Sequence, residues 1–223
     1  FSYSKFDSIL IGRLIGMKEL GIYNVGVQVA SLPASKFSSI INQVGFTAFS
    51  SINDDSDKGK RYLTKSIRLA AFMLFPIFYG ISSVSELLVT LLIGDKWMAA
   101  APIIAIFSFV FPLRMINTII QNYLNSIDLA GFNLQNTLLT FFILIISILS
   151  GSYFGVVGVA TSWLIGYSFS FIIILIRTSI ITKISYTLLF SWVPAFLVSL
   201  GMWIILHLFE ADMSNLFLDL LLK

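Results

Sequence analysis

The stretch "LLTFFILIISILSGSYFGVVGVA", residues 138–160, contains no charged residue and is long enough to cross a lipid bilayer. A membrane-spanning helix needs about 20 mostly apolar residues. A second run, "WLIGYSFSFIIILI" at residues 163–176, follows almost directly. These runs predict an all-α fold, a bundle of transmembrane helices that crosses the membrane several times.

The composition of the whole chain agrees with this prediction. Hydrophobic residues make up 57% of the 223 and charged residues only 11%, whereas soluble domains carry about 25% charged residues. Cysteine is absent, which excludes disulfides, thiol chemistry and Cys-ligated metals. The chain begins without Met inside an apolar segment, so we expect residues 1–223 to be a single transmembrane domain from the later part of a longer protein.

The apolar runs and their breaks predict the order of the helices. The first helix is expected to end near Ile15, before a turn at Gly16–Gly21. Pro33 and Pro76 are expected to bend the second and third helices. The short segment 85–94 is predicted to lie at the membrane interface. The expected ranges after the first helix are 20–52, 60–80, 100–127, 131–150, 155–181 and 187–209, with a last helix from about Met213.

The basic residues predict the orientation of these helices. One group lies between the second and third helices: Lys58, Lys60, Arg61, Lys65 and Arg68. A second group, Arg177 and Lys183, lies between the sixth and seventh helices. The two groups fall on the same side of the membrane if each span crosses once. Since basic connections face the cytoplasm, this side is predicted to be cytoplasmic. The placement accounts for the net charge of +3 without a nucleic-acid partner.

Two of the predicted helices carry polar residues at steps of three and four, which places them near one face. In the helix over 20–52 these are Asn24, Gln28, Ser31, Ser35, Ser38 and Asn42. In the helix over 100–127 and just after it they are Arg114, Thr118, Gln121, Asn125 and Asp128. Lipid offers no hydrogen-bond partner, so both faces are expected to point at other helices or at water.

Two interpretations of these faces compete. Ser and Asn side chains can join helices, with each hydrogen bond contributing about 0.6 kcal/mol. Burying a cation such as Arg114 costs at least about 2.5 kcal/mol, which helix packing alone does not explain. A hydrated cavity that holds an anion does explain it, and we favour that interpretation.

Asp7 and Arg13 raise the same question in the first helix. They lie six residues apart, about 9 Å along the helix axis, too far apart for the close pair that residues four apart form. Each must therefore find a partner on another helix, in headgroups or in water. For Arg13, contact with headgroups and a role in substrate binding both remain open.

The sequence offers no set of residues for catalysis, for a metal or for a cofactor. His207 is the only histidine, and we interpret it as a residue of the membrane interface. No Ser-His-Asp set, metal cluster, phosphate loop or pair of catalytic carboxylates can be assembled from the pattern. We therefore do not expect an enzyme.

Three stretches carry a resemblance to a known family. They are "DSILIGRLIGMKELGIYNVGVQVASLP" at 7–33, "FTAFSSINDDSDKGKRYLTKSIRL" at 46–69 and "ELLVTLLIGDKWMAAAPI" at 86–103. Together they resemble the second half of the lipid-linked oligosaccharide flippases, the polysaccharide-transporter family of the MOP exporter superfamily. The sequence departs from the family at Thr47, where Pro is usual, and at Asp128, where the family commonly has Gly-Arg nearby.

The resemblance implies one lobe, about helices seven to fourteen, of a two-lobed transporter in the bacterial inner membrane. The implied substrate is an oligosaccharide repeat unit on an undecaprenyl diphosphate carrier, exported for O-antigen, capsule or exopolysaccharide synthesis. The bilayer and the polysaccharide polymerase machinery are the implied partners. Asp7 is the expected ion-coupling residue, and the expected substrate-binding residues are Arg114, Gln121, Asn125, Asn24, Gln28, Asn42 and Arg13.

Other functions remain as alternatives at this point. A multidrug exporter of the same superfamily would favour acidic residues deep in its cavity over Arg. A membrane-embedded glycosyltransferase or acyltransferase would need carboxylates or a His at the mouth of a loop. A scaffold would not require two aligned polar faces.

Overall fold

The computed structural model describes residues 3–50 and 56–221, with side chains described for 7–37, 57–187 and 189–209. Every regular element in these ranges is a helix, which confirms the predicted all-α class. Among the described residues, four helices are long and apolar enough to cross a membrane. In chain order the elements are α1 (Tyr3–Leu14), α2 (Met17–Ser50), α3 (Ser56–Ser83), α4 (Ser85–Leu92), the 3-10 helix η1 (Asp95–Ala100), α5 (Ala101–Ser126), α6 (Ala130–Ser152), α7 (Gly155–Thr182), α8 (Tyr186–Leu189) and α9 (Val193–Leu221).

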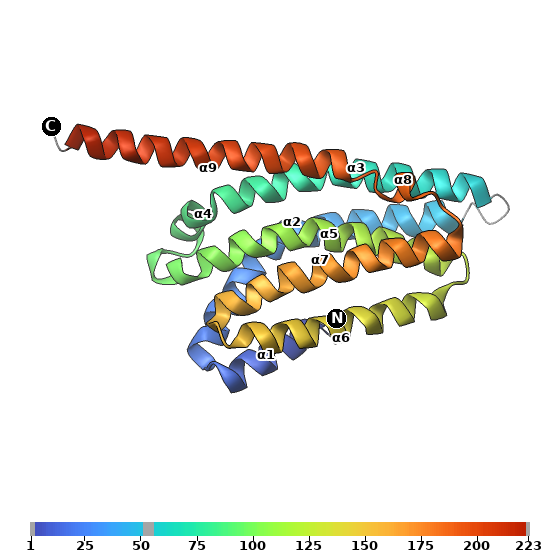
Figure 1. Ribbon diagram of the computed structural model, residues 1–223, viewed down its shortest axis with the longest axis horizontal. Coiled ribbons are helices and arrows are strands. Elements are labelled where there is room, and N and C mark those ends of the chain that lie inside the picture. The colour runs from blue at the N-terminus through green and yellow to red at the C-terminus, as the bar shows by residue number, and fades with distance from the viewer. Residues whose placement is uncertain (1–2, 51–55, 222–223) are drawn as a thin grey trace.

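The long helices lie roughly side by side, so the bundle has two ends (Figure 1). One end holds the start of α3, the α5–α6 turn and the end of α7. The other holds the α1–α2 turn, α4 with η1, and the α6–α7 turn. The two basic groups of the sequence therefore lie at the same end, as predicted, and we call it the basic end.

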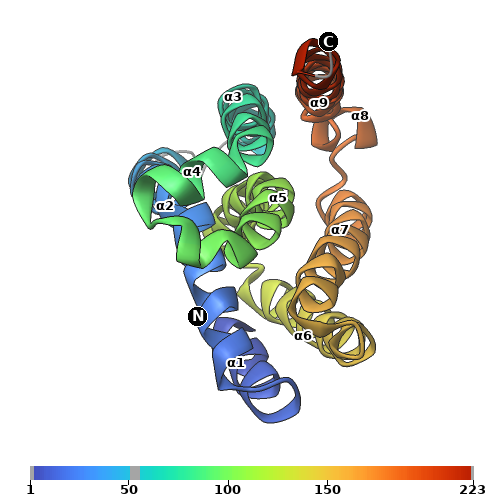
Figure 2. The same ribbon diagram turned by 90° about the vertical axis from the view of Figure 1, so that its left-hand side faces the viewer.

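Helix α5 lies at the centre of the bundle and contacts α2, α3, α6 and α7 (Figure 2). Most of its side chains between Ile103 and Leu124 are buried. Helix α2 approaches it closely because Gly26 leaves room: a Cβ at this position would lie 2.7 Å from Cγ2 of Ile103. Helix α1 contacts both α2 and α6, so α1, α2, α5, α6 and α7 surround one region of the bundle.

The outer surface of the bundle is apolar in the way that a lipid-facing surface requires. On α6 the exposed residues recur at every fourth position: Leu134, Leu138, Phe142 and Ile146. The opposite face of α6 packs against α7, where Gly151 and Gly158 bring the two backbones into contact. Small residues permit such close approach between membrane helices.

Three predicted boundaries are wrong. The turn after the first helix is confined to Ile15 and Gly16, since α2 begins at Met17. The region 187–209 is divided between α8 and α9. No separate helix begins near Met213, because α9 continues unbroken to Leu221. The physical reason is that residues 202–221 contain neither Gly nor Pro to end a helix, so the polar residues there do not interrupt it.

Candidate functional site

The carboxylate of Asp7 is buried between α1 and α2. Asp7 is only 3% exposed, and the Tyr23 hydroxyl donates a hydrogen bond of 2.8 Å to its Oδ2. The backbone N–H of Ser8 donates to Oδ1 at 2.7 Å. Both carboxylate oxygens therefore have a donor, and of the partners expected for Asp7 (another helix, headgroups or water) the structure shows one on another helix.

Arg114 of α5 lies in the same region. Its guanidinium carbon is 5.4 Å from the ring centroids of both Phe111 and Trp163, and the Trp163 indole lies beside the Asp7–Tyr23 pair. The positive charge of Arg114 attracts Asp7, but the described side chains show no direct ion pair between them. Asp7, Tyr23, Arg114 and Trp163 thus form one group drawn from α1, α2, α5 and α7, which we call the Asp7 cluster.

One buried acceptor beside the cluster lacks a partner. Asn117, one turn after Arg114, donates from Nδ2 to the Tyr167 hydroxyl at 3.2 Å, while its Oδ1 accepts no hydrogen bond from the described residues. Unpaired buried polar groups are costly. This acceptor is therefore open to water or to a ligand.

The polar face predicted for α2 points outward. Asn24, Gln28 and Ser35 are exposed and Ser31 is half-buried, so these four lie near one face. Both serine hydroxyls donate to carbonyl groups of their own helix, at 2.8 Å. Asn24 accepts a hydrogen bond of 3.2 Å from the hydroxyl of Ser8. The side chains of Ser38 and Asn42 lie outside the described part of the structure.

The remaining predicted residues are spread along the bundle. Gln121 is half-buried, and Asn125 is exposed and accepts a hydrogen bond of 2.9 Å from Asn133 of α6. Asp128 does not extend the polar face of α5, because it lies in the turn after the helix with φ of 59°. Arg13 is exposed at the α1–α2 end, opposite the end that holds Asn125. The structure therefore brings Asp7 and Arg114 together, and it does not gather the whole predicted set.

The sequence analysis missed Tyr23 and Trp163. A signal for Tyr23 was present: an antiparallel helix pair with its turn at Gly16 places residues 7 and 8 opposite 23 and 24. The contacts Asp7–Tyr23 and Ser8–Asn24 both follow this spacing. Trp163 carried no such signal, because its place in the cluster depends on how α7 lies relative to α1, α2 and α5.

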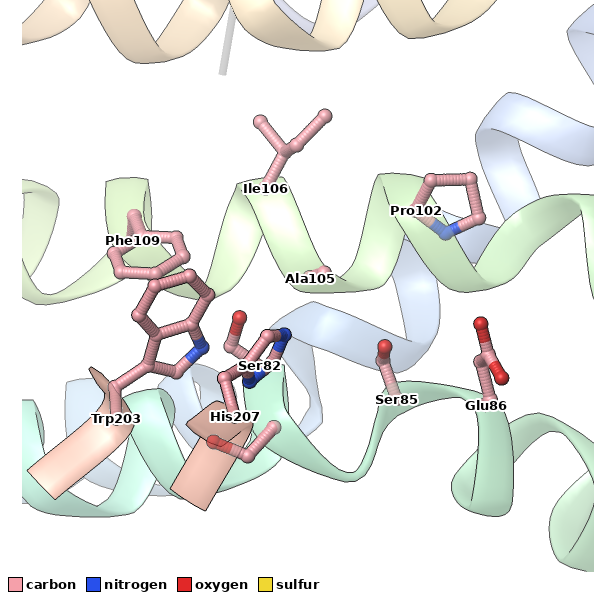
Figure 3. Close-up of a pocket in the computed structure, with 10 residues that line it drawn as sticks. Ser82, Ser85, Glu86, Pro102, Ala105, Ile106, Phe109, Trp203 and His207 are labelled. Atoms are coloured by element: carbon pink, nitrogen blue, oxygen red, sulfur yellow. The ribbon is translucent and has the colours of Figure 1, made fainter. Parts of the chain in front are cut away.

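A separate cavity of about 520 Å³ lies at the end opposite the basic end, between the α3–α4 junction, α5 and α9 (Figure 3). His207 lines it and stacks on Trp203, with the ring centroids 4.3 Å apart. The sequence pattern gave no indication of this cavity. The predicted interface position of His207 is not tested by the structure.

Comparison with known proteins finds similarity to proteins of polysaccharide biosynthesis. Residues 1–102 match the family model described as polysaccharide biosynthesis protein. The teichuronic acid biosynthesis protein TuaB of Bacillus subtilis is 34% identical over 113 residues, covering 51% of this chain and 23% of TuaB. The lipopolysaccharide biosynthesis protein WzxC of Escherichia coli is 25% identical over 198 residues, covering 87% of this chain and 40% of WzxC.

The succinoglycan biosynthesis transport protein ExoT of Rhizobium meliloti is 24% identical over 98 residues, covering 44% of this chain and 20% of ExoT. The chain spans less than half the length of these curated relatives. No solved structure matches it significantly. The matches agree with the resemblance to the polysaccharide-transporter family: this multi-pass membrane chain is similar to proteins named for polysaccharide biosynthesis and transport.

Proposed function

We propose that the chain is part of a transporter that moves a lipid-linked oligosaccharide, carried on undecaprenyl diphosphate, across the bacterial inner membrane. The observation that supports this most strongly is the placement of Arg114. Its guanidinium lies against two aromatic rings inside an apolar bundle and forms no direct ion pair with any described carboxylate. A guanidinium held in this way is suited to bind an anionic phosphate group.

Placing the Arg114 cation inside the bundle costs free energy, and the chemistry of the substrate gives a reason for this placement. The diphosphate and its sugars must cross about 30 Å of hydrocarbon while the lipid tail stays in the bilayer. Arg114 would meet the diphosphate through paired, charge-assisted hydrogen bonds. The open acceptor on Asn117 would take up part of the hydrogen bonding of the sugar hydroxyls. Alternating exposure to the two sides would follow from rocking of one lobe against the other.

The exposed amide face of α2 supports the same proposal. Asn24 and Gln28 cannot point at hydrocarbon without losing their hydrogen bonds to water. We infer that this face borders a polar path shared with another part of the full-length transporter. Amide groups there would replace water around the sugar hydroxyls.

Asp7 is the ion-coupling residue of this proposal. It is the one buried acidic residue among the described side chains, and it is electrostatically linked to Arg114. Binding of an anion at Arg114 would weaken that attraction, so occupancy at the two residues would be coupled. The identity of the ion, a proton or Na⁺, is decided by experiment.

One observation favours a second function. A buried carboxylate flanked by Tyr23 and Trp163 is also suited to an organic cation, as in the multidrug exporters of the superfamily. Arg114 would repel such a substrate. The two functions therefore make opposite predictions for removal of the Arg114 charge.

The test uses the full-length protein in vesicles with a fluorescent lipid-linked oligosaccharide. Arg114→Ala should abolish transport while membrane insertion is retained, and Arg114→Lys should restore only part of it because Lys cannot form the paired contacts. Arg68→Ala, at an exposed position of α3, is the matched control and should transport normally. Unchanged transport by Arg114→Ala would refute the proposed role, and faster export of an organic cation would favour the second function.

A second experiment tests Asp7. With Asp7→Asn, transport should lose its dependence on an ion gradient while the protein still binds substrate. An Asp7→Asn protein that keeps the gradient dependence would remove Asp7 from the coupling mechanism without affecting the proposal for Arg114.

A further inference from the structure

The cavity between the α3–α4 junction, α5 and α9 holds polar groups that nothing in the bundle satisfies. Ser82 is only 3% exposed, and its hydroxyl has no hydrogen-bond partner among the described residues. The indole nitrogen of Trp203 is also buried and without a partner there. Figure 3 shows both groups pointing into the same space beneath α5. Two donors therefore converge on one unfilled position.

Among the described side chains, the cavity lining carries a single charge. Glu86, at the start of α4, is the one acidic residue of that described lining, which contains no Lys or Arg. The lining also has an aromatic wall: Phe109 meets Trp203 edge to face at 5.3 Å, and Trp203 stacks on His207. Figure 3 shows Glu86 on the side of the cavity opposite this aromatic wall. A carboxylate there can accept charge-assisted hydrogen bonds from an ammonium group.

The surroundings indicate a ligand with acyl chains. The cavity lies near one end of the bundle, where lipid headgroups meet the ends of membrane helices. Exposed apolar side chains flank it on two helices, with Leu87 and Leu91 on α4 and Ile204 and Leu208 on α9. Acyl chains can pack against these side chains while a polar head occupies the cavity.

We propose that this cavity binds the phosphoethanolamine headgroup of a membrane phospholipid. Glu86, on one side of the cavity, accepts hydrogen bonds from the ammonium group. The Ser82 hydroxyl and the Trp203 indole N–H donate to the phosphate oxygens. A phosphatidylglycerol headgroup has no cation to offer Glu86. This inference goes beyond the proposed transport function and does not depend on it.

Native mass spectrometry of the purified full-length protein tests the proposal. The protein is incubated with equal amounts of phosphatidylethanolamine and phosphatidylglycerol, and the bound lipids are counted. The wild-type protein should retain phosphatidylethanolamine in preference. Glu86→Gln should lower this preference about tenfold, the effect of losing one charged hydrogen bond. Asp95→Asn, an exposed carboxylate at the same end but outside the cavity, should leave the preference unchanged.

Two further arms identify which part of the headgroup is recognised. Soluble phosphoethanolamine should displace the bound lipid. It should also shift the tryptophan fluorescence of the wild-type protein, and this shift should be absent from Trp203→Phe. Inorganic phosphate should neither displace the lipid nor shift the fluorescence. Equal retention of the two lipids by the wild-type protein would overturn the proposal. Equal losses of the preference for phosphatidylethanolamine in Glu86→Gln and Asp95→Asn would also overturn it, because equal losses would indicate a general effect of surface charge. Displacement by phosphate alone would overturn the role of Glu86.

Discussion

The Asp7 cluster and the cavity beside Glu86 are both polar regions within an apolar bundle. They differ in whether the chain provides hydrogen-bond partners for their buried polar groups. Each oxygen of the Asp7 carboxylate accepts a hydrogen bond from the chain, and Arg114 supplies a charge of opposite sign. In the cavity, neither a partner for the Ser82 hydroxyl and the Trp203 indole nor a lining cation is found among the described residues. We therefore expect the first region to contribute to folding stability and the second to contribute little until a ligand binds.

The largest expected effect is that of Asp7→Ala. This substitution removes the acceptor of the Tyr23 hydroxyl and of the Ser8 N–H, together with the negative charge that attracts Arg114, so it should destabilise the fold by about 3 kcal/mol. Thermal unfolding in detergent measures the change. Asp7→Asn keeps an oxygen that can accept the hydrogen bond from Tyr23, so this variant should lose distinctly less stability than Asp7→Ala. Equal losses in the two variants would mean that the hydrogen bond from Tyr23 contributes little.

Tyr23→Phe should have a smaller effect of the same sign. The ring and its edge-to-face contact with Phe107, at 5.8 Å, remain. One oxygen of a buried carboxylate loses its donor, which costs about 1–3 kcal/mol. Chemical denaturation in mixed micelles measures this cost. Tyr62→Phe, on a half-buried residue of α3, is the control for removal of a hydroxyl elsewhere. A change no larger than in that control would show that the cluster tolerates an unpaired carboxylate oxygen.

Ser82→Ala should have the smallest effect. Since the hydroxyl forms no hydrogen bond with the described residues, its removal breaks no bond there and should leave the free energy of unfolding unchanged or slightly raised. The measurement must use protein stripped of lipid. Added phosphatidylethanolamine should then stabilise the wild-type protein more than the variant. A loss above about 1 kcal/mol in the stripped protein would contradict the view that the hydroxyl is unsatisfied.

Much of the fold could be predicted because lipid imposes a simple rule on sequence. Uncharged runs as long as 138–160 have few alternatives to membrane helices, so the expected range 131–150 agrees closely with α6. The same rule indicates that Asp7 needs a partner on another helix, in headgroups or in water. The separate helix expected from about Met213 is wrong, because a helix ends at backbone signals such as Gly and Pro, and residues 202–221 contain neither.

The candidate site was harder to predict than the helices. Periodicity places Arg114 on a face of α5, but it does not say which helix that face meets. Trp163 is distant from both Asp7 and Arg114 in sequence, and only the packing of α7 brings it to them. The spacing of Asn24 and Gln28 alone predicts the amide face of α2. Its exposure depends on which side of α2 packs against α5, and that is the opposite side, where Gly26 lies close to Ile103.

The glycine contact between α6 and α7 constrains how the molecule can move. With Gly151 and Gly158 in backbone contact, neither helix can slide past the other without a steric clash. The pair should therefore behave as a single rigid arm. Any motion of the α6–α7 pair relative to the rest of the bundle would therefore take place where α7 contacts α5. Arg114 and Trp163 lie at that contact. The position of the pair would then determine how closely the Arg114 guanidinium packs against the Trp163 ring.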